Sequence, residues 1–269
     1  MCSAAMARRR DTAMQIEFTI ELLDLAVFFV AILYAVLVLT IADLARRKFN
    51  LRLEFTRRII HLFAGAAIWT VPYFPHPWVA TFVGLAFVIM LSFANNERFS
   101  RFFAAMARPE DLENQSVRGP LWYAVSITIL TAIFTFTGYE RLYFVAAAAI
   151  HIMMFGDGMS APIGIRYGAD SSRIILGSKR SPQGSAALLV FGFLGAILAF
   201  WYFGVLTYGV FVLAGEIQWA PIVILALIGA ITGTLVELVS PKGTDNVFLP
   251  LASCVVILVT GMFLGVVVF

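Results

Sequence analysis

The sequence predicts an all-α, polytopic transmembrane protein, and its composition and apolar runs are the observations behind that prediction. Hydrophobic residues make up 61% of the 269 residues and charged residues only 13%, with a mean hydropathy of +0.91. Soluble domains carry about 45–50% apolar and about 25% charged residues. The apolar runs are continuous, whereas a membrane β-barrel alternates apolar and polar positions. A soluble globular domain, a disordered chain and a coiled coil are therefore excluded.

A spanning helix needs about 20 mostly apolar residues, and about eight stretches meet that rule. The first is too long for a cleavable signal peptide and is followed by the basic residues at 46–48, so we interpret it as a retained helix. The second is short, which leaves seven spans as an alternative. We expect a short polar segment at 1–19, followed by one integral-membrane catalytic domain at 20–269. The expected helices are 20–43, 59–73, 78–94, 120–137, 142–165, 184–208, 219–238 and 247–269.

Basic residues predict the orientation, because loops rich in Lys and Arg stay in the cytoplasm. Counted by the helix that each follows, loop 1 carries six basic residues, loop 3 four, loop 5 four and loop 7 one, out of 19. These loops are expected on the cytoplasmic side and both termini on the other side. The arginines at 8–10 favour the opposite orientation, but the basic residues of the loops outnumber them. The net charge of +3 is interpreted as topology, not as nucleic-acid binding.

Asp157 is the sharpest functional candidate, because ionisable groups inside spans are rare and usually functional. Pro162 removes a helical hydrogen bond, and Gly156 and Gly158 weaken the helix further, so a broken or kinked helix is expected beside the carboxylate. Gly164 continues a small-residue face that recurs every four residues from Gly156 and suits close helix packing. Asp157 is expected to bind a metal or a substrate; the alternative is a packing kink with a carboxylate reaching the interface.

The segment GSKRSPQGS at 177–185 precedes the sixth helix and suggests a phosphate site. Free N–H groups and the helix dipole favour anions at a helix N-terminus, and Lys and Arg add charge-assisted bonds to phosphate. The order of a P-loop is absent, and ordinary positive-inside anchoring is the alternative. The expected phosphate-binding residues here are Lys179, Arg180, Ser181, Gly184 and Ser185.

Glu237, Asp245 and Asn246 crowd a short turn near the expected cytoplasmic ends of the last two helices. With Asp157, these carboxylates could hold Mg²⁺, which prefers a few carboxylates together with phosphate oxygens and water. The expected metal ligands are thus Asp157, Asp245 and Glu237. Alternatively, Asp245 and Asn246 only cap the last helix.

Arg57, Arg58 and His61 lead into the second helix. Arg57 and His61 are four residues apart and share a helical face, where they could bind a phosphate or a prenyl pyrophosphate. Taken alone, this cluster is more typical of membrane anchoring. His151 and Asp157 are six residues apart and are not expected to pair, and His76 is interpreted as a turn residue.

Five segments in this order make the chain resemble the phytol kinase and dolichol kinase family, distant relatives of the phosphatidate cytidylyltransferases. The resemblance runs from about Arg57 to Ala252 and is closer to the phytol and farnesol kinase branch. Its strongest part is GDG at 156–158 followed by the segment at 178–185. The segments are 57–61 (RRIIH), 119–123 (GPLWY), 156–168 (GDG…G…YG), 178–185 (SKRSPQGS), and 236–237 (VE) with 245–251 (DNVFLPL).

The resemblance implies transfer of the γ-phosphate of CTP to an isoprenoid alcohol such as phytol, farnesol, geranylgeraniol or a longer prenol. It implies phosphate and metal roles for Asp157, Lys179, Glu237, Asp245 and Asn246, with Mg²⁺ as the cofactor and CTP as the cosubstrate. From the residues, Asp157, Lys179 and Glu237 are the catalytic candidates. We add Arg57, Arg58 and His61 as groups that close the site from the second helix.

Two rival functions rank below the kinase. A cytidylyltransferase carries K-D, GHGG and D-R-x-D elements, which this sequence lacks. A transporter predicts polar groups at the midplane and an inverted repeat, whereas here the charges gather at one face. The expected partners are CTP, an isoprenoid alcohol and the bilayer, with no nucleic acid and with room for a homo-oligomer. The expected location is a prokaryotic inner membrane, with the active site on the cytoplasmic side.

Overall fold

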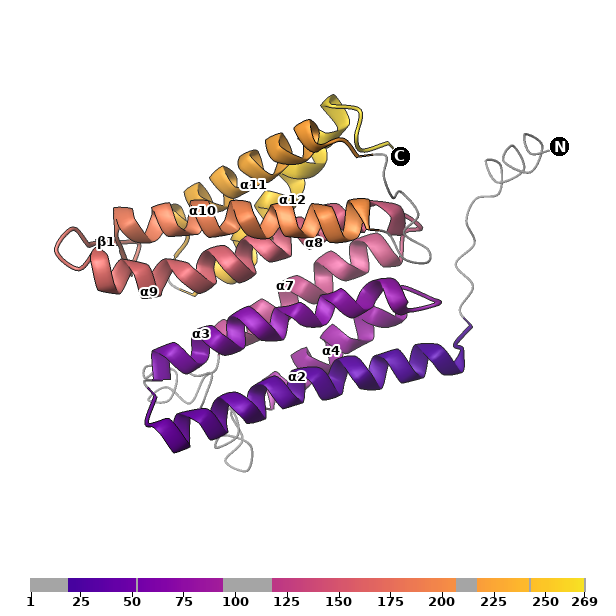
Figure 1. The fold of residues 1–269 in the computed structure, drawn as a ribbon, viewed down its shortest axis with the longest axis horizontal. Coiled ribbons are helices and arrows are strands. Elements are labelled where there is room, and N and C mark those ends of the chain that lie inside the picture. The colour runs from indigo at the N-terminus through magenta and orange to yellow at the C-terminus, as the bar shows by residue number, and fades with distance from the viewer. Residues whose placement is uncertain (1–18, 52, 94–117, 207–216, 242, 269) are drawn as a thin grey trace.

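The structure, a computed structural model, describes residues 19–51, 53–93, 118–206, 217–241 and 243–268. The chain is an all-α polytopic membrane protein, as predicted. Its helices lie lengthwise beside one another in a bundle (Figure 1). Most of the expected segment 1–19, the arginines at 8–10 and the loop arginines at 98, 101 and 108 lie outside the described residues, as do Arg52 and Lys242.

Each of the eight expected spans coincides with a helical segment. The first half of the chain forms α2 (Leu22–Phe49), α3 (Leu53–Ala64), the 3₁₀ segment η1 (Gly65–Tyr73), α4 (Val79–Ser92) and α7 (Arg118–Thr135). The second half forms η2 (Glu140–Leu142), α8 (Tyr143–His151), the π-helical η3 (Ile152–Asp157), α9 (Gly158–Tyr167), β1 (Arg173–Ile175), β2 (Ser178–Arg180), α10 (Pro182–Ala199), η4 (Phe200–Val205), α11 (Trp219–Val239) and α12 (Asp245–Phe263).

Five of these stretches are long and apolar enough to cross a membrane, and two shorter apolar helices accompany them. The shorter ones are α4 and the stretch Gly119–Thr135 of α7. The remaining expected span is α3 continued by η1, which contains Pro72 and runs beside α2. The five long stretches are Leu22–Phe49, Glu140–Tyr167, Pro182–Val205, Trp219–Val239 and Asp245–Phe263.

The central helix α8 is the core of the bundle. Every residue from Tyr143 to His151 is buried, and α7, α10 and α12 pack around it. A helix that is apolar all round is stable only when neighbours cover every side. The segment that carries Asp157 is therefore held in place by surrounding helices.

The helix at Asp157 is irregular, as expected, but it is continuous and not broken. The irregularity is the π-helical η3, which ends at Asp157, and Pro162 lies inside the regular α9 that follows. Single π-helical turns are often found at functional sites. The sixth expected helix also ends in a π-helical segment, η4, which contains Gly204.

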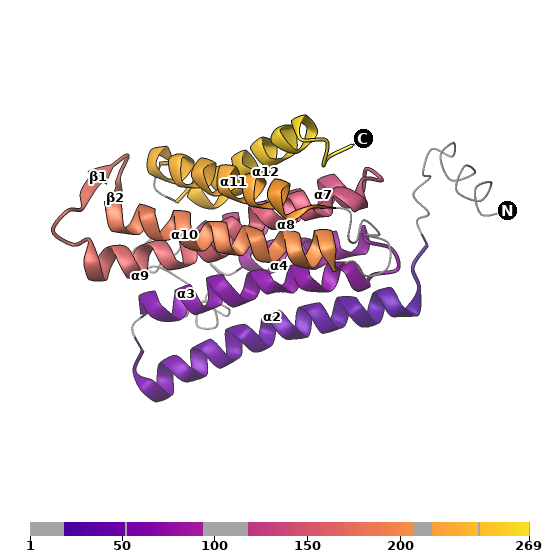
Figure 2. The ribbon, with the colours of Figure 1, turned by 45° about the horizontal axis from the view of Figure 1, so that its top comes forward.

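A β-hairpin joins α9 to α10 and projects from one end of the bundle (Figure 2). Arg173 pairs with Arg180, and Ile175 pairs with Ser178. Leu176 and Gly177 both have positive φ, of 46° and 80°, as a two-residue type I′ turn requires. Part of the segment expected to lead into the sixth helix is thus the second strand of this hairpin.

Candidate active site

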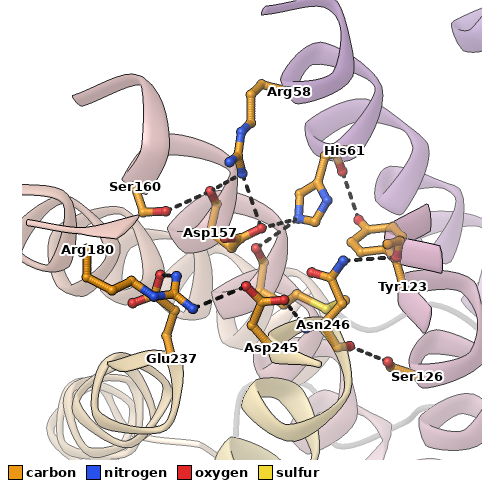
Figure 3. Close-up of polar contacts among 12 residues, drawn as sticks. Arg58, His61, Tyr123, Ser126, Asp157, Ser160, Arg180, Glu237, Asp245 and Asn246 are labelled. Carbon is orange, nitrogen blue, oxygen red and sulfur yellow. Dashed lines mark hydrogen bonds and ion pairs between the residues drawn. The ribbon is translucent and has the colours of Figure 1, made fainter. Parts of the chain in front are cut away.

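Many of the polar residues singled out in the sequence lie close together. Figure 3 shows this for Arg58, His61, Asp157, Arg180, Glu237, Asp245 and Asn246, at the end of the bundle that carries the hairpin. A cavity of about 640 Å³ lies there, between α3, η3, α9, the hairpin, α10, α11 and α12. The clustering expected from the sequence is therefore present in three dimensions. Its walls include the expected site residues Arg57, Arg58, Asp157, Gly164, Lys179, Arg180, Ser181, Gly184, Ser185, Glu237 and Asp245.

Asp157 forms the first of two ion-pair groups. Arg58 Nη1 donates to the backbone oxygen of Asp157 at 2.8 Å and lies 3.3 Å from Oδ2. His61 Nε2 is 3.4 Å from the same Oδ2 and 3.3 Å from the backbone oxygen of Met153. Ser160 Oγ also donates to the backbone oxygen of Asp157, at 3.0 Å. The carboxylate is therefore held by two side chains from α3. Arg58 and His61, singled out in the sequence, both lie beside Asp157.

Arg180 forms the second group. Its Nη1 contacts Oε1 of Glu237, and its Nη2 lies 3.4 Å from Oδ2 of Asp245. Glu237 and Asp245 are buried and the side chain of Arg180 is exposed by only 10%, and the Nε of Arg180 has no hydrogen-bond partner among the described residues. A buried cation of this kind is tolerated only when carboxylates compensate it. Arg180 therefore holds α11 and the start of α12 against the hairpin.

Asn246 fixes the start of α12 against α7. Its Nδ2 donates to the backbone oxygen of Gly119 at 3.0 Å, and Ser126 Oγ donates to the backbone oxygen of Asn246. Its own backbone N–H donates to Oδ1 of Asp245 at 3.1 Å. The amide side chain is thus committed to the 119–123 segment. We therefore assign Asn246 the role of positioning Asp245.

The expected phosphate segment divides between strand and helix. Lys179 is exposed on β2 and faces the cavity. Ser181 is the N-cap of α10, and its Oγ accepts from the backbone N–H of Gly184 at 3.1 Å. Ser185 N donates to the backbone oxygen of Ser181 at 3.0 Å. A capped helix N-terminus and an exposed cation thus face the same cavity, an arrangement that favours an anion.

The small-residue face of η3 and α9 packs against α10, as expected. A Cβ on Gly156 would lie 3.0 Å from the backbone oxygen of Leu188, and one on Gly164 would lie 2.8 Å from Oγ of Ser181. Gly158 faces α3 instead, with His61 the nearest side chain at 3.8 Å. Close approach of α9 and α10 brings Asp157 and the N-terminus of α10 to one cavity.

A second cavity, mainly apolar, adjoins the first and runs between α2, α3, η1, α4 and α7. Three residues line both cavities: Arg57, Arg58 and Asp157. His61 and Asn246 line the apolar cavity near this junction. Tyr123, whose hydroxyl donates to the backbone oxygen of His61 at 2.8 Å, forms part of its wall. A polar and an apolar chamber therefore meet at Asp157.

The three expected metal ligands are not gathered into one cluster. Within the described ranges, no three His, Cys, Asp or Glu side chains lie close enough together to hold a metal ion. Asp157 belongs to one ion-pair group, and Glu237 and Asp245 belong to the other. Mg²⁺ usually takes only one or two carboxylates and completes its shell with water and substrate phosphates. The donor chemistry of the cavity wall fits that pattern.

Some contacts have no signal in the sequence. His76, interpreted as a plain turn residue, has its Nδ1 2.8 Å from Oδ2 of the fully buried Asp24, at the opposite end of the bundle. Ser126 and Ser160 join the site through backbone oxygens. By contrast, Tyr123 could have been expected near the site, because it lies in the segment 119–123 that contributes to the family resemblance. His151, as expected, does not contact Asp157; it bonds to Trp69 and Ala147.

Comparison with known proteins identifies relatives over most of the chain. A probable chloroplastic phytol kinase 1 of Glycine max is 30% identical over 226 residues, covering 80% of this chain and 69% of the relative. A phytol kinase of Synechocystis is 28% identical over 218 residues, covering 80% and 83%. The chloroplastic phytol kinase 1 of Arabidopsis thaliana is 26% identical over 229 residues, covering 81% and 69%. No family model matches the chain, and no solved structure matches it significantly. The extent and identity of the first of these matches show that the chain belongs to the phytol kinase family.

Proposed function

We propose that this protein is a membrane lipid kinase that transfers the γ-phosphate of CTP to an isoprenoid alcohol. The observation that carries the proposal is the junction at Asp157. Arg57, Arg58 and Asp157 line both the polar cavity and the apolar one. A prenol in the apolar cavity would bring its hydroxyl to this junction, where a nucleotide in the polar cavity would present its terminal phosphate. The names of the relatives support this reaction class.

Charge supports an anionic ligand in the polar cavity. Among the residues that the structure describes, four cationic side chains line it against three carboxylates, and the N-terminus of α10 adds a partial positive charge. Arg180 pairs with Glu237 and Asp245, and Arg58 pairs with Asp157. We therefore assign the exposed Lys179 to the phosphates first, with Arg57 and Arg58 on the wall beside them. The basic loops favour the cytoplasm for this end of the bundle, which is also where CTP would be available.

Mg²⁺ would be held by Asp245 and Glu237 on one wall of the cavity, with Asp157 across from them. When bound, the ion would neutralise phosphate charge, which is the main requirement of phosphoryl transfer. Asp157 itself would orient the prenol hydroxyl, since Arg58 and His61 fix its carboxylate. Holding the two reactants in a reactive geometry can supply a large part of the rate enhancement.

In the proposed step, the prenol oxygen forms a bond to the γ-phosphorus as the bond from that phosphorus to the β,γ-bridging oxygen breaks. The hydroxyl proton passes to the Asp157 carboxylate, and CDP leaves with the bridging oxygen. The products are a prenyl monophosphate and CDP, so no oxidant or further reactant is needed.

The test is a product assay with the purified full-length chain. Geranylgeraniol or phytol, Mg²⁺ and either CTP, ATP, GTP or UTP are supplied, and the lipid and nucleotide products are separated. Prenyl phosphate with an equal amount of CDP supports the proposal. Pyrophosphate released with phosphatidate as acceptor would establish a cytidylyltransferase instead. Absence of both products from folded protein would leave transport as the surviving function.

A further inference from the structure

We propose that the apolar cavity limits the length of the acceptor, with Val71, Ala80 and Thr131 forming the wall that the end of the isoprenoid chain meets. The inference rests on the proposed function, because it treats the cavity as the site of the prenol tail. It adds what that function leaves open: how long the tail is and which residues decide it.

The cavity follows the helices from the Asp157 junction toward the opposite end of the bundle. Along α7 its wall extends from Gly119, beside Asn246, to Thr131. Twelve residues of helix correspond to a depth of about 18 Å. Along α4 the wall runs in the other chain direction, from Leu91 to Ala80, which gives about 16 Å at the same rise per residue. Two helices thus give similar depths for the cavity.

The far end is closed by buried residues. Val71, Ala80 and Thr131 are exposed by only 3%, 6% and 3%. Oγ1 of Thr131 lies 3.1 Å from the hydroxyl of Tyr143. One turn further along α7, Thr135 meets Thr81 of α4, with 3.1 Å between their Oγ1 atoms. These hydrogen bonds join α7 to α8 and to α4, so the helices close together where the cavity ends.

This depth corresponds to three to four isoprenoid units. A four-carbon repeat of an extended chain spans about 5 Å, because three backbone bonds of similar geometry span about 3.5 Å. A tail of 15 to 20 carbons therefore fills the cavity when its hydroxyl lies at Asp157. A much longer prenol would leave most of its chain outside, and a 10-carbon prenol would leave the deep half of the cavity empty.

Lining substitutions test the limit. Leucine in place of Ala80 occupies the deepest turn, and Val83→Phe blocks the cavity one turn nearer the junction. Leu85→Phe, on the same helix but facing outward with 38% exposure and outside the lining, is the control. Val71→Ala deepens the cavity without adding bulk, which keeps the test open if a larger side chain prevents folding.

The measurement is kcat/KM for geraniol, farnesol, geranylgeraniol and a 45-carbon prenol with the full-length protein. Wild type is expected to prefer the 15- and 20-carbon alcohols. Ala80→Leu is expected to lower the 20-carbon rate relative to the 10-carbon rate by about tenfold or more, the size of effect that one misplaced group has in an apolar pocket. Val83→Phe should shift the preference further toward geraniol, and Leu85→Phe should leave the profile unchanged.

The inference and the proposed function fail differently. If wild type phosphorylates no prenol of any length, both are wrong. If prenols are phosphorylated but Ala80→Leu and Val71→Ala keep the wild-type length profile, only the length limit is overturned. Equal rates for 20- and 45-carbon alcohols in wild type would also overturn it.

Discussion

Arg58 and Asp157 are 99 residues apart in the chain, and Nη1 of the arginine bonds to the backbone oxygen of the aspartate while pairing with its carboxylate. This pair joins α3 to the end of η3 at the point where the two cavities meet. The arginine therefore fixes both the backbone and the side chain of the residue that we assign to the prenol hydroxyl.

Arg58→Lys is expected to lower kcat/KM for the prenol by about tenfold or more while leaving the protein folded. Lysine keeps the charge but lacks the planar fork of donors, and one hydrogen bond to a charged group contributes about 1.5–3 kcal/mol. Steady-state kinetics measure the effect. The matched control is Arg47→Lys, whose pair with Asp43 is exposed on the arginine side and of a kind that contributes little. Equal rates in both variants would contradict the role given to Arg58.

Arg180→Ala is expected to destabilise the fold by about 3–5 kcal/mol, because it leaves Glu237 and Asp245 as uncompensated buried charges. The variant Arg180→Met combined with Glu237→Met should lose less than the sum of the two single changes, since the partners are removed together. Unfolding midpoints in detergent test this. The exposed hairpin residue Arg173, changed to Ala, is the control. An unfolding midpoint for Arg180→Ala equal to that of the control would contradict the stabilising role given to Arg180.

Gly156→Ala and Gly158→Ala should differ in stability although they lie two residues apart. A methyl group at Gly156 would meet the backbone oxygen of Leu188 at 3.0 Å, whereas the nearest atom at Gly158 is 3.8 Å away. Overpacking costs typically about 1–3 kcal/mol, and alanine in place of glycine stabilises a helix by up to about 1 kcal/mol. The thermal unfolding midpoint should therefore fall for Gly156→Ala and stay the same or rise for Gly158→Ala. The reverse order would mean that α10 does not pack on this face.

Asp24→Ala should lower stability without changing catalysis. The carboxylate is fully buried and accepts from the backbone N–H groups of Glu21 at 2.9 Å and His76 at 3.0 Å, besides contacting the His76 ring. Leaving buried donors unpaired costs about 1–3 kcal/mol each. Because this cluster lies at the end of the bundle away from the polar cavity, the KM values for CTP and prenol in the folded fraction should match wild type. A raised KM would show that the two ends are coupled.

The sequence could predict the spans and the gathering of polar groups, for physical reasons that need no tertiary detail. Apolar length alone locates α11 and the beginnings of α10 and α12 within two residues, but it places the ends of α10 and α12 too far along the chain. Alternating spans bring every second loop to one end, so the sequence could predict that Arg57, Asp157, Lys179 and Asp245 lie at the same end of the bundle. The spacing of small residues also predicted the face on which Gly156 and Gly164 pack.

The pairings inside the site could not be predicted, because they depend on the rotation of each helix about its axis. Arg180 could equally have faced a phosphate; its selection of Glu237 and Asp245, 57 and 65 residues away, follows from how α11 and α12 pack. The π-helical η3 takes the place of the expected break, and the backbone stays helical through Pro162 in α9. His76 does lie in a turn, as interpreted, but its contact with Asp24 could not be predicted because the sequence does not show that α2 begins beside it.

The most direct test of the central claim is the turnover of Asp157→Asn in the presence of CTP, Mg²⁺ and geranylgeraniol, with folding verified by unfolding midpoint. Asparagine keeps the size and can still accept from Arg58 and His61, but it removes the charge that would orient the hydroxyl and take its proton. A general base contributes typically about 10²–10⁴-fold, so kcat is expected to fall by at least about a hundredfold with the KM for CTP little changed. Folded Asp157→Asn protein that forms prenyl phosphate at the wild-type rate would contradict the account.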